Sequence, residues 1–134
     1  MNHWLIKSEP SAYSWERLVK EKRARWDGIR NFQARNNLQA MKKGDLCLFY
    51  HSGKEPSVVG IAKVVGAPYP DPTSNDPRWV AVDLAPRRAL ETPVTIAMLK
   101  ANERTQGMTL LRQGRLSVSP VTPAEFAAVV ELGS

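Results

Sequence analysis

The residues between Arg25 and Ser52 are of the kinds that bind nucleotides. Residues 26–36 read Trp-Asp-Gly-Ile-Arg-Asn-Phe-Gln-Ala-Arg-Asn, and residues 49–52 read Phe-Tyr-His-Ser. Aromatic faces stack on a flat ring, amides hydrogen-bond to its polar edge, and arginines bind phosphate. No combination of nucleophile, base and orienting residue indicates a catalytic triad in this run. The run therefore favours recognition of a nucleotide-sized ligand over catalysis.

Positive charge is concentrated in the same part of the chain. Residues 1–50 contain 10 Lys or Arg against 5 Asp or Glu, whereas residues 51–134 contain 9 against 8. This imbalance and a pI of about 9.8 favour an anionic partner, of which the phosphate backbone of nucleic acid is the commonest. The alternative is solubilising charge on an exposed helix face, formed by Arg17, Lys20, Lys22, Arg23 and Arg25.

Length and composition predict a single domain over residues 1–134. The 43% of hydrophobic residues can supply a core without disulfides or metals. Cys47 lies in the apolar run Leu-Cys-Leu-Phe, which indicates a buried thiol in a reducing compartment. The only nitrogen or sulfur ligands are Cys47, His3 and His51, and their spacing matches no zinc motif. We therefore expect no metal and no cofactor.

No stretch of the sequence indicates targeting or membrane insertion. Lys7 and Glu9 interrupt the first apolar stretch, and no apolar run approaches the roughly 20 residues that span a bilayer. We expect a monomeric cytoplasmic protein, or a nuclear one in a eukaryote, without a membrane partner.

The elements that must position these residues follow from periodicity and capping. Apolar patterns predict strands at 3–7, 45–50, 58–65, 78–84 and 116–121, and helices after Ser14, over 31–41, 95–101 and 108–113, and after Thr122. Ser14 and Asn31 are suited to cap helices, and Thr122-Pro123 with Glu125 forms a capping box. Gly60 and Gly66 predict a bulge or a close backbone approach, and the Pro-rich segment 67–77 predicts a loop. Strands and helices do not alternate strictly, so we predict an α+β fold around a curled sheet or small barrel.

A series of motifs covers most of the chain. They are Trp-Leu-Ile-Lys-Ser-Glu-Pro at 4–10, Tyr-Ser at 13–14, the run at 26–36, Phe-Tyr-His-Ser at 49–52, Val-Gly at 59–60 and Tyr-Pro-Asp at 69–71. This series resembles the EVE domain, a member of the PUA-like group that is similar to YTH and ASCH domains. The resemblance implies a small β-barrel of mixed, mostly antiparallel strands flanked by helices. It also implies a non-catalytic pocket for one modified nucleobase, a modified cytosine or a related base flipped out of DNA or RNA.

The resemblance also implies roles for individual residues. Glu9 would accept a hydrogen bond from an exocyclic amine, and Trp26 would supply the stacking wall. Trp79 is a weaker candidate for a second wall. The predicted phosphate-binding residues are Arg30 and Arg35. The predicted base-binding residues are Lys7, Ser8, Glu9, Trp26, Gly28, Asn31, Tyr50, His51, Ser52, Tyr69 and Asp71.

Several of these residues have structural alternatives. A tryptophan near a helix start is more often a core residue than a ligand-binding wall. His51 follows a buried strand, where a histidine is more often structural than catalytic. Arg30 and Asp27 could form only a surface ion pair, worth about 0 to 1 kcal/mol.

Two other function classes remain open from the sequence. Some ASCH-like proteins hydrolyse small modified nucleosides, and Lys7, Glu9 and Tyr50 could form an acid–base or nucleophile set. Alternatively, the Pro-rich loop at 68–77 could bind a protein partner.

Overall fold

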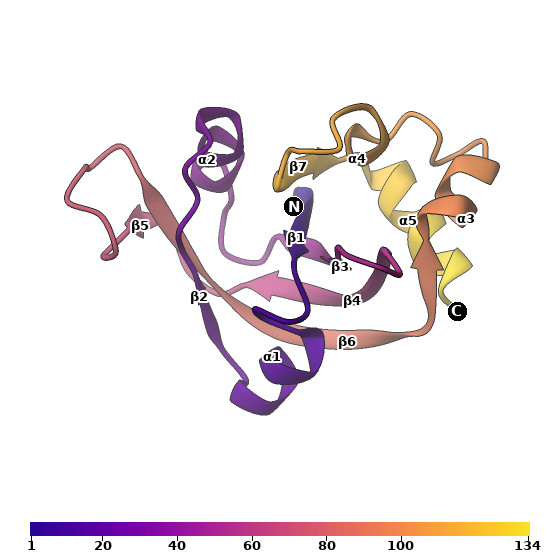
Figure 1. Cartoon of the computed structure of the whole chain (residues 1–134), viewed down its shortest axis with the longest axis horizontal. Helices are drawn as coiled ribbons and strands as arrows, with labels where there is room; N and C mark the ends of the chain where they lie inside the picture. The colour runs from indigo at the N-terminus through magenta and orange to yellow at the C-terminus, as the bar shows by residue number, and fades with distance from the viewer.

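Seven strands form one curled sheet in the computed structural model, which describes all 134 residues (Figure 1). The strands are β1 (His3–Ser8), β2 (Ala24–Trp26), β3 (Leu46–His51), β4 (Ser57–Val64), β5 (Tyr69–Pro70), β6 (Val80–Thr95) and β7 (Val118–Val121). Six of them lie in the order β2-β6-β4-β3-β1-β7, and β5 pairs with β6. β1 and β3 are parallel, and every other pair is antiparallel. The predicted α+β fold with mixed, mostly antiparallel strands is confirmed.

Five helices surround this sheet, and most begin at the predicted cap. They are α1 (Trp15–Glu21), α2 (Phe32–Gln39), α3 (Ile96–Ala101), α4 (Thr109–Arg112) and α5 (Pro123–Leu132). The side chains of Ser14, Asn31, Thr95 and Thr122 each accept a hydrogen bond from a backbone N–H of the first turn. At α5, Glu125 returns a bond to the N–H of Thr122, which completes the predicted capping box. The predicted caps therefore located the starts of α1, α2 and α5, whereas the Thr95 cap of α3 was not predicted.

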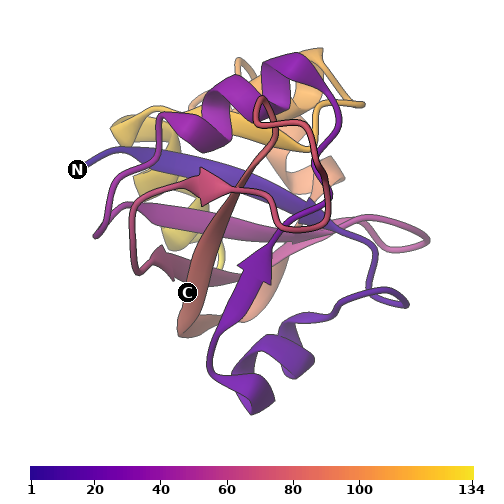
Figure 2. The same cartoon turned by 90° about the vertical axis from the view of Figure 1, so that its left-hand side faces the viewer.

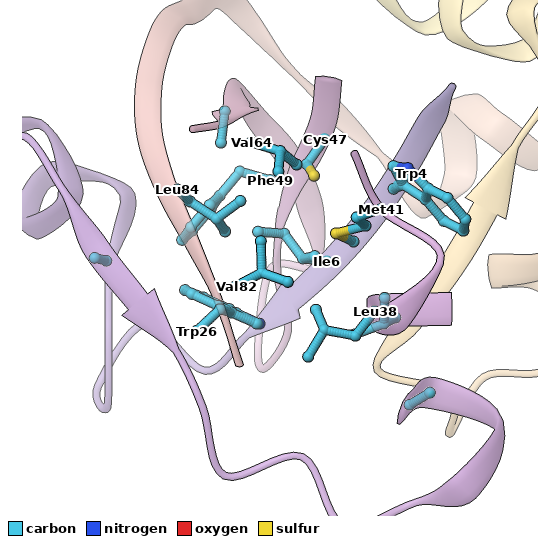
Figure 3. Packing of buried hydrophobic residues seen from close by; sticks show 14 of the residues in the cluster. Trp4, Ile6, Trp26, Leu38, Met41, Cys47, Phe49, Val64, Val82 and Leu84 are labelled. Atoms are coloured by element: carbon cyan, nitrogen blue, oxygen red, sulfur yellow. The ribbon is translucent and has the colours of Figure 1, made fainter. Parts of the chain in front are cut away.

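The two faces of the sheet have separate hydrophobic clusters because successive strand residues point to opposite sides. The first face, covered by α1 and α2, buries Ile6, Phe49 and Trp26 among others. Figure 3 shows these side chains converging with Leu38 of α2. The second face buries Leu5 and aliphatic residues of α3, α4 and α5. These three helices gather together on the right of Figure 1, away from α1 and α2.

Three strand predictions needed correction. β2 was missed because its three residues follow a charged segment that reads as an exposed helix face. β6 continues to Thr95, well beyond the predicted end at residue 84. Its second half pairs only with β4, and Pro86 and Pro93 lie at the two places where this pairing shifts register, which are positions where a strand tolerates proline. The loop predicted at 67–77 contains the short strand β5.

The two glycines of the β4 region behave differently. The pairing of β4 with β6 shifts register between Val58 and Gly60, as the sequence predicted. A Cβ at Gly60 would lie 2.6 Å from the Trp15 ring, so the indole of α1 packs directly on the strand backbone. Gly66 has open space around it, so the predicted close approach is absent there.

Candidate nucleic-acid interface

A cavity of about 290 Å³ opens between the end of β1, the turn before α1, and β2. This volume is at the lower end of the roughly 300–1,000 Å³ typical of small-ligand pockets. Its lining combines two aromatic rings with one carboxylate and one guanidinium, and consists of Ser8, Ala12, Tyr13, Ala24, Arg25, Trp26 and Asp27. Ser8 and Trp26 are therefore brought together, as the sequence predicted. β2 and the segment that follows it appear on the near side in Figure 2.

Tyr13 and Trp26 form the aromatic part of this cavity. Their rings meet edge to face, with centroids 5.9 Å apart, and Trp26 also meets Phe49 edge to face at 5.6 Å. Trp26 is only 9% exposed, so it belongs to the core as well as to the cavity wall. Burial and a 2.7 Å hydrogen bond from the Tyr13 hydroxyl to Glu21 raise the pKa of Tyr13 to about 12. Tyr13 is therefore neutral at physiological pH, and both rings have fixed positions.

The polar groups of the cavity are also fixed. The Ser8 hydroxyl donates to the carbonyl oxygen of Tyr13, which ties the end of β1 to the following turn. Arg25 Nε donates to Asp27 Oδ2 at 2.7 Å, and this hydrogen bond raises the pKa of Arg25. The Asp27 side chain remains 31% exposed, so its carboxylate can still accept a hydrogen bond from a ligand.

Asp71, predicted at the rim of the pocket, instead braces the loop after β2. Its fully buried carboxylate accepts bonds from the backbone N–H of Gly28 at 2.8 Å and from Arg30 at 2.9 Å. Thr73 donates to it from its backbone N–H and its hydroxyl. Burial alone would raise the pKa of Asp71, but these bonds outweigh it and hold the pKa well below its usual range. The ion pair of Arg30 is thus with Asp71, not with Asp27.

Gly28 and Tyr69 are likewise engaged in structural contacts. Gly28 has a φ of +76°, a conformation that favours glycine, and its N–H is used by Asp71. The Tyr69 hydroxyl donates to Asp83 at 2.5 Å; burial and this bond raise the pKa of Tyr69 to about 12. Gly28 therefore fixes the loop after β2, and Tyr69 links β5 to β6.

Glu9, His51 and Ser52 line a different cavity, of about 600 Å³. His51 Nε2 accepts a 2.9 Å hydrogen bond from the backbone N–H of Trp15. Burial lowers the pKa of His51, which preserves the neutral form that this bond requires. The backbone N–H of Ser52 donates to the carbonyl oxygen of Ser8. The structure therefore does not place Glu9 with Trp26, and it gives His51 the structural contact that was the alternative.

Lys7 and Tyr50 lie on the second face of the sheet. They are register partners in β1 and β3, and the Lys7 ammonium lies 5.8 Å from the centroid of the Tyr50 ring. Lys7 donates to the carbonyl oxygen of Gly114, and burial lowers its pKa. Tyr50 is 5% exposed. Because alternate residues of a strand point to opposite sides, this pair is separated from Ser8 and Trp26.

Asn31 and Arg35 lie at the start of α2. Asn31 caps the helix by accepting from the N–H of Ala34 at 2.9 Å, and it borders a shallow pocket with Arg115. Arg35 donates to Gln39 at 2.7 Å and has no carboxylate partner. Its charge is therefore available to a phosphate.

Comparison with known proteins identifies the family. The sequence model of the EVE domain matches residues 2–132. The chain belongs to the EVE-domain family. Thymocyte nuclear protein 1 of Mus musculus is 38% identical over an alignment covering 98% of this chain and 73% of that protein.

Solved structures place this EVE domain among close structural relatives. A protein from Agrobacterium tumefaciens has a TM-score of 0.96 at 42% identity, covering 100% of this chain and 94% of that one. Human THYN1, solved with DNA containing 5-methylcytosine, has a TM-score of 0.93 at 34% identity, covering 100% and 98%. A mutant ASCH protein from Zymomonas mobilis, 14% identical with a TM-score of 0.62, shares the fold. The predicted PUA-like fold is confirmed.

Of the seven residues that line the cavity of this EVE domain, the sequence predicted Ser8 and Trp26 and missed five, of which Tyr13, Arg25 and Asp27 carry functional groups. Tyr13 and Asp27 both lie inside the motifs that identify the family, so their positions carried a usable signal. The signal was overlooked because β2, which presents Arg25 and Trp26 to the cavity, was not predicted. The structure contains no helix long and apolar enough to cross a membrane, and no group of three acidic, His or Cys side chains that could hold a metal ion.

Proposed function

We propose that this EVE domain binds DNA carrying a modified cytosine, and that the cavity of Tyr13 and Trp26 receives the base without catalysing a reaction. One observation carries the proposal: two fixed aromatic rings and a partly exposed carboxylate share a cavity of about 290 Å³. The complex of human THYN1 with DNA containing 5-methylcytosine supports the choice of ligand, because that protein belongs to the same structural group.

The chemistry of the cavity suits cytosine. The exocyclic amine of cytosine is a donor, and Asp27 presents an acceptor that Arg25 holds in place. Glu9 was predicted for this contact, but it lines another cavity. The rings of Tyr13 and Trp26 offer apolar surface to the base and to a methyl group on it.

The free energies favour a target that is easily unstacked. Extruding a base from a duplex costs a few kcal/mol, and a base–aromatic contact returns about 1–3 kcal/mol. A hydrogen bond to a charged group such as Asp27 contributes about 1.5–3 kcal/mol more. These gains are similar to the cost of extrusion, so single-stranded, mismatched or already opened DNA should bind more tightly than intact duplex.

Removal of the Asp27 carboxylate tests the assignment of the cavity. Asp27→Ala should lower affinity for single-stranded DNA containing 5-methylcytosine by about tenfold or more, because the amine loses a charged acceptor. Tyr13→Phe, which keeps the ring, should bind nearly as wild type. Glu131→Ala is the matched control, because it also removes a carboxylate paired with an arginine, but on α5. Fluorescence anisotropy with labelled oligonucleotides gives the affinities; unchanged binding by Asp27→Ala would place the base elsewhere.

The same protein should not turn over modified nucleosides. An enzyme based on Lys7, Glu9 and Tyr50 would need these groups at one centre, whereas Glu9 lines a cavity that contains neither Lys7 nor Tyr50. Incubation with N4-substituted cytidines, followed by chromatography, should give no product. Product that disappears in Lys7→Ala would establish an enzyme instead.

A further inference from the structure

An exposed pair of aromatic rings lies outside the cavity. Phe32, the first residue of α2, stacks on Trp79 with ring centroids 4.8 Å apart and an interplanar angle of 26°. Phe32 is 49% exposed, although its bulk and apolar character favour burial. Trp79, predicted as a second wall beside Trp26, does not line that cavity. Figure 2 shows the loop that precedes β6 running beside α2.

Three arginines surround this ring pair. The guanidinium carbons of Arg35 and Arg78 lie 5.8 and 5.5 Å from the centroid of the Phe32 ring, and that of Arg30 lies 5.7 Å from Trp79. Each distance is within the range of a cation–π contact. We name Phe32, Trp79, Arg30, Arg35 and Arg78 the aromatic–arginine platform.

Two carboxylates order the platform without neutralising it. Asp71 holds Arg30, and Asp76 binds Arg78 through both of its carboxylate oxygens. Arg35 bonds only to the neutral side chain of Gln39. Three guanidinium groups against two carboxylates leave one net positive charge beside an exposed ring. This combination complements a strand that alternates flat bases with phosphates.

The platform is joined to the cavity by a braced segment. Trp26 lines the cavity and Phe32 begins α2, and the loop between them is anchored through Gly28 and Arg30 to Asp71. Asp71 in turn precedes the loop that carries Trp79. The loop that leaves the cavity and the segment that leads to Trp79 are therefore held by the same carboxylate.

From this arrangement we infer that the aromatic–arginine platform binds an unpaired base of the DNA strand next to the base in the cavity. The base stacks on the part of the Phe32 ring that remains exposed beside Trp79 and the guanidinium groups, and Arg35 and Arg78 contact its flanking phosphates. The inference rests on the proposed function for the identity of the partner. The platform contributes affinity for the strand whatever its cytosine modification, whereas the cavity discriminates between modified and plain cytosine.

Photocrosslinking locates the stacked base. The probe is a single-stranded oligonucleotide with 5-iododeoxyuridine next to 5-methylcytosine, irradiated with the full chain and analysed by mass spectrometry. The crosslink should fall on Phe32 or Trp79, and Phe32→Leu, which keeps an apolar contact with Trp79, should remove a crosslink at Phe32. A crosslink confined to other residues would overturn the inference.

Affinities of matched variants test the energetic role. Phe32→Ala and Phe32→Leu should each weaken binding at least threefold, equally for strands with cytosine and with 5-methylcytosine, since one base–aromatic stack is lost. Val19→Ala, which trims a side chain that is 48% exposed on α1, is the control and should bind as wild type. A loss of affinity smaller than threefold, in Phe32 variants that remain folded, would overturn the inference.

Salt dependence tests the arginines separately. Arg35→Gln should reduce the slope of log affinity against log salt concentration by about 0.7, the value for one phosphate contact on a single strand. Arg104→Gln, which alters an arginine bound to Glu131, should leave the slope unchanged. Asp27→Ala should weaken binding of strands with cytosine and with 5-methylcytosine alike, because both bases carry the exocyclic amine, but it should keep the platform crosslink at saturating protein concentration. Failure of the cavity and failure of the platform therefore give different results.

Discussion

The two faces of the sheet differ in both composition and closure. The first face buries Trp4, Trp15 and Trp26, whereas the second buries mainly aliphatic residues and methionine, with Tyr50 as its one buried aromatic ring. Three helices, α3 to α5, close the second face together, but α1 and α2 stand apart on the first (Figure 1). The cavity lies between the turn before α1 and β2, and the aromatic–arginine platform lies where the start of α2 meets the loop before β6.

This difference shows how one sheet serves stability and recognition at once. On the second face, α3, α4 and α5 cover the sheet with aliphatic side chains, so most of its residues contribute packing. On the first face, β2 and the loop after it separate the helices, and polar side chains there border the cluster directly. Aromatic residues suit such a border, because a ring can pack in the core along one edge and contact a ligand along another.

Truncation of one large side chain on each face gives the strongest test. Trp26→Ala should lower the free energy of unfolding by about 3–5 kcal/mol, and Leu99→Ala on α3 by about 2–5 kcal/mol, because both side chains are buried. Urea denaturation measures both values. Only Trp26→Ala should also reduce the preference for 5-methylcytosine over cytosine among molecules that remain folded. Loss of that preference in Leu99→Ala would mean that the second face contributes to recognition.

Gly60→Ala tests how tightly α1 is held on the first face. The new Cβ would lie 2.6 Å from the ring of Trp15, which is itself buried, so the indole or the strand must move. Overpacking of this kind costs about 1–3 kcal/mol. Gly66→Ala is the control, because nothing lies within 4 Å of the corresponding Cβ. Thermal unfolding followed by circular dichroism should show a lower midpoint for Gly60→Ala alone.

Asp71→Asn should lower the free energy of unfolding by about 2 kcal/mol, because the hydrogen bonds that hold the loop after β2 would then go to a neutral acceptor and be weaker. The pH dependence gives a sharper test. The pKa of Asp71 is depressed in the folded state, so its stabilising contribution is complete above the ordinary pKa of 3.8 and is lost as the pH falls below that value. The difference in unfolding free energy between wild type and Asp71→Asn should therefore shrink between neutral pH and pH 3. A constant difference would show that the charge of Asp71 is not what braces the loop.

Local signals in the sequence predicted elements better than they predicted the site. Helix caps such as Asn31 and Thr122 act within one turn, so residue type alone located them. The site depends on which side of a strand a residue points to and on which loop Asp71 reaches, and both are set by tertiary packing. Lys7 and Ser8 are neighbours in one motif, yet they point to opposite faces of the sheet. The family motifs therefore identified the residues near the site but not their contacts.

Lys7→Met offers the smallest expected effect and the most direct test of the difference between the faces. Methionine keeps most of the apolar stem that lies over Tyr50 and removes only the ammonium group, which donates to the carbonyl oxygen of Gly114. The loss of one partly exposed hydrogen bond should cost about 0.5–1.5 kcal/mol of stability. The preference for 5-methylcytosine should stay within twofold of wild type, because the side chain points away from the cavity. A clear loss of preference, measured by anisotropy beside Trp26→Ala, would instead support the base-binding role that the sequence motif predicts for Lys7.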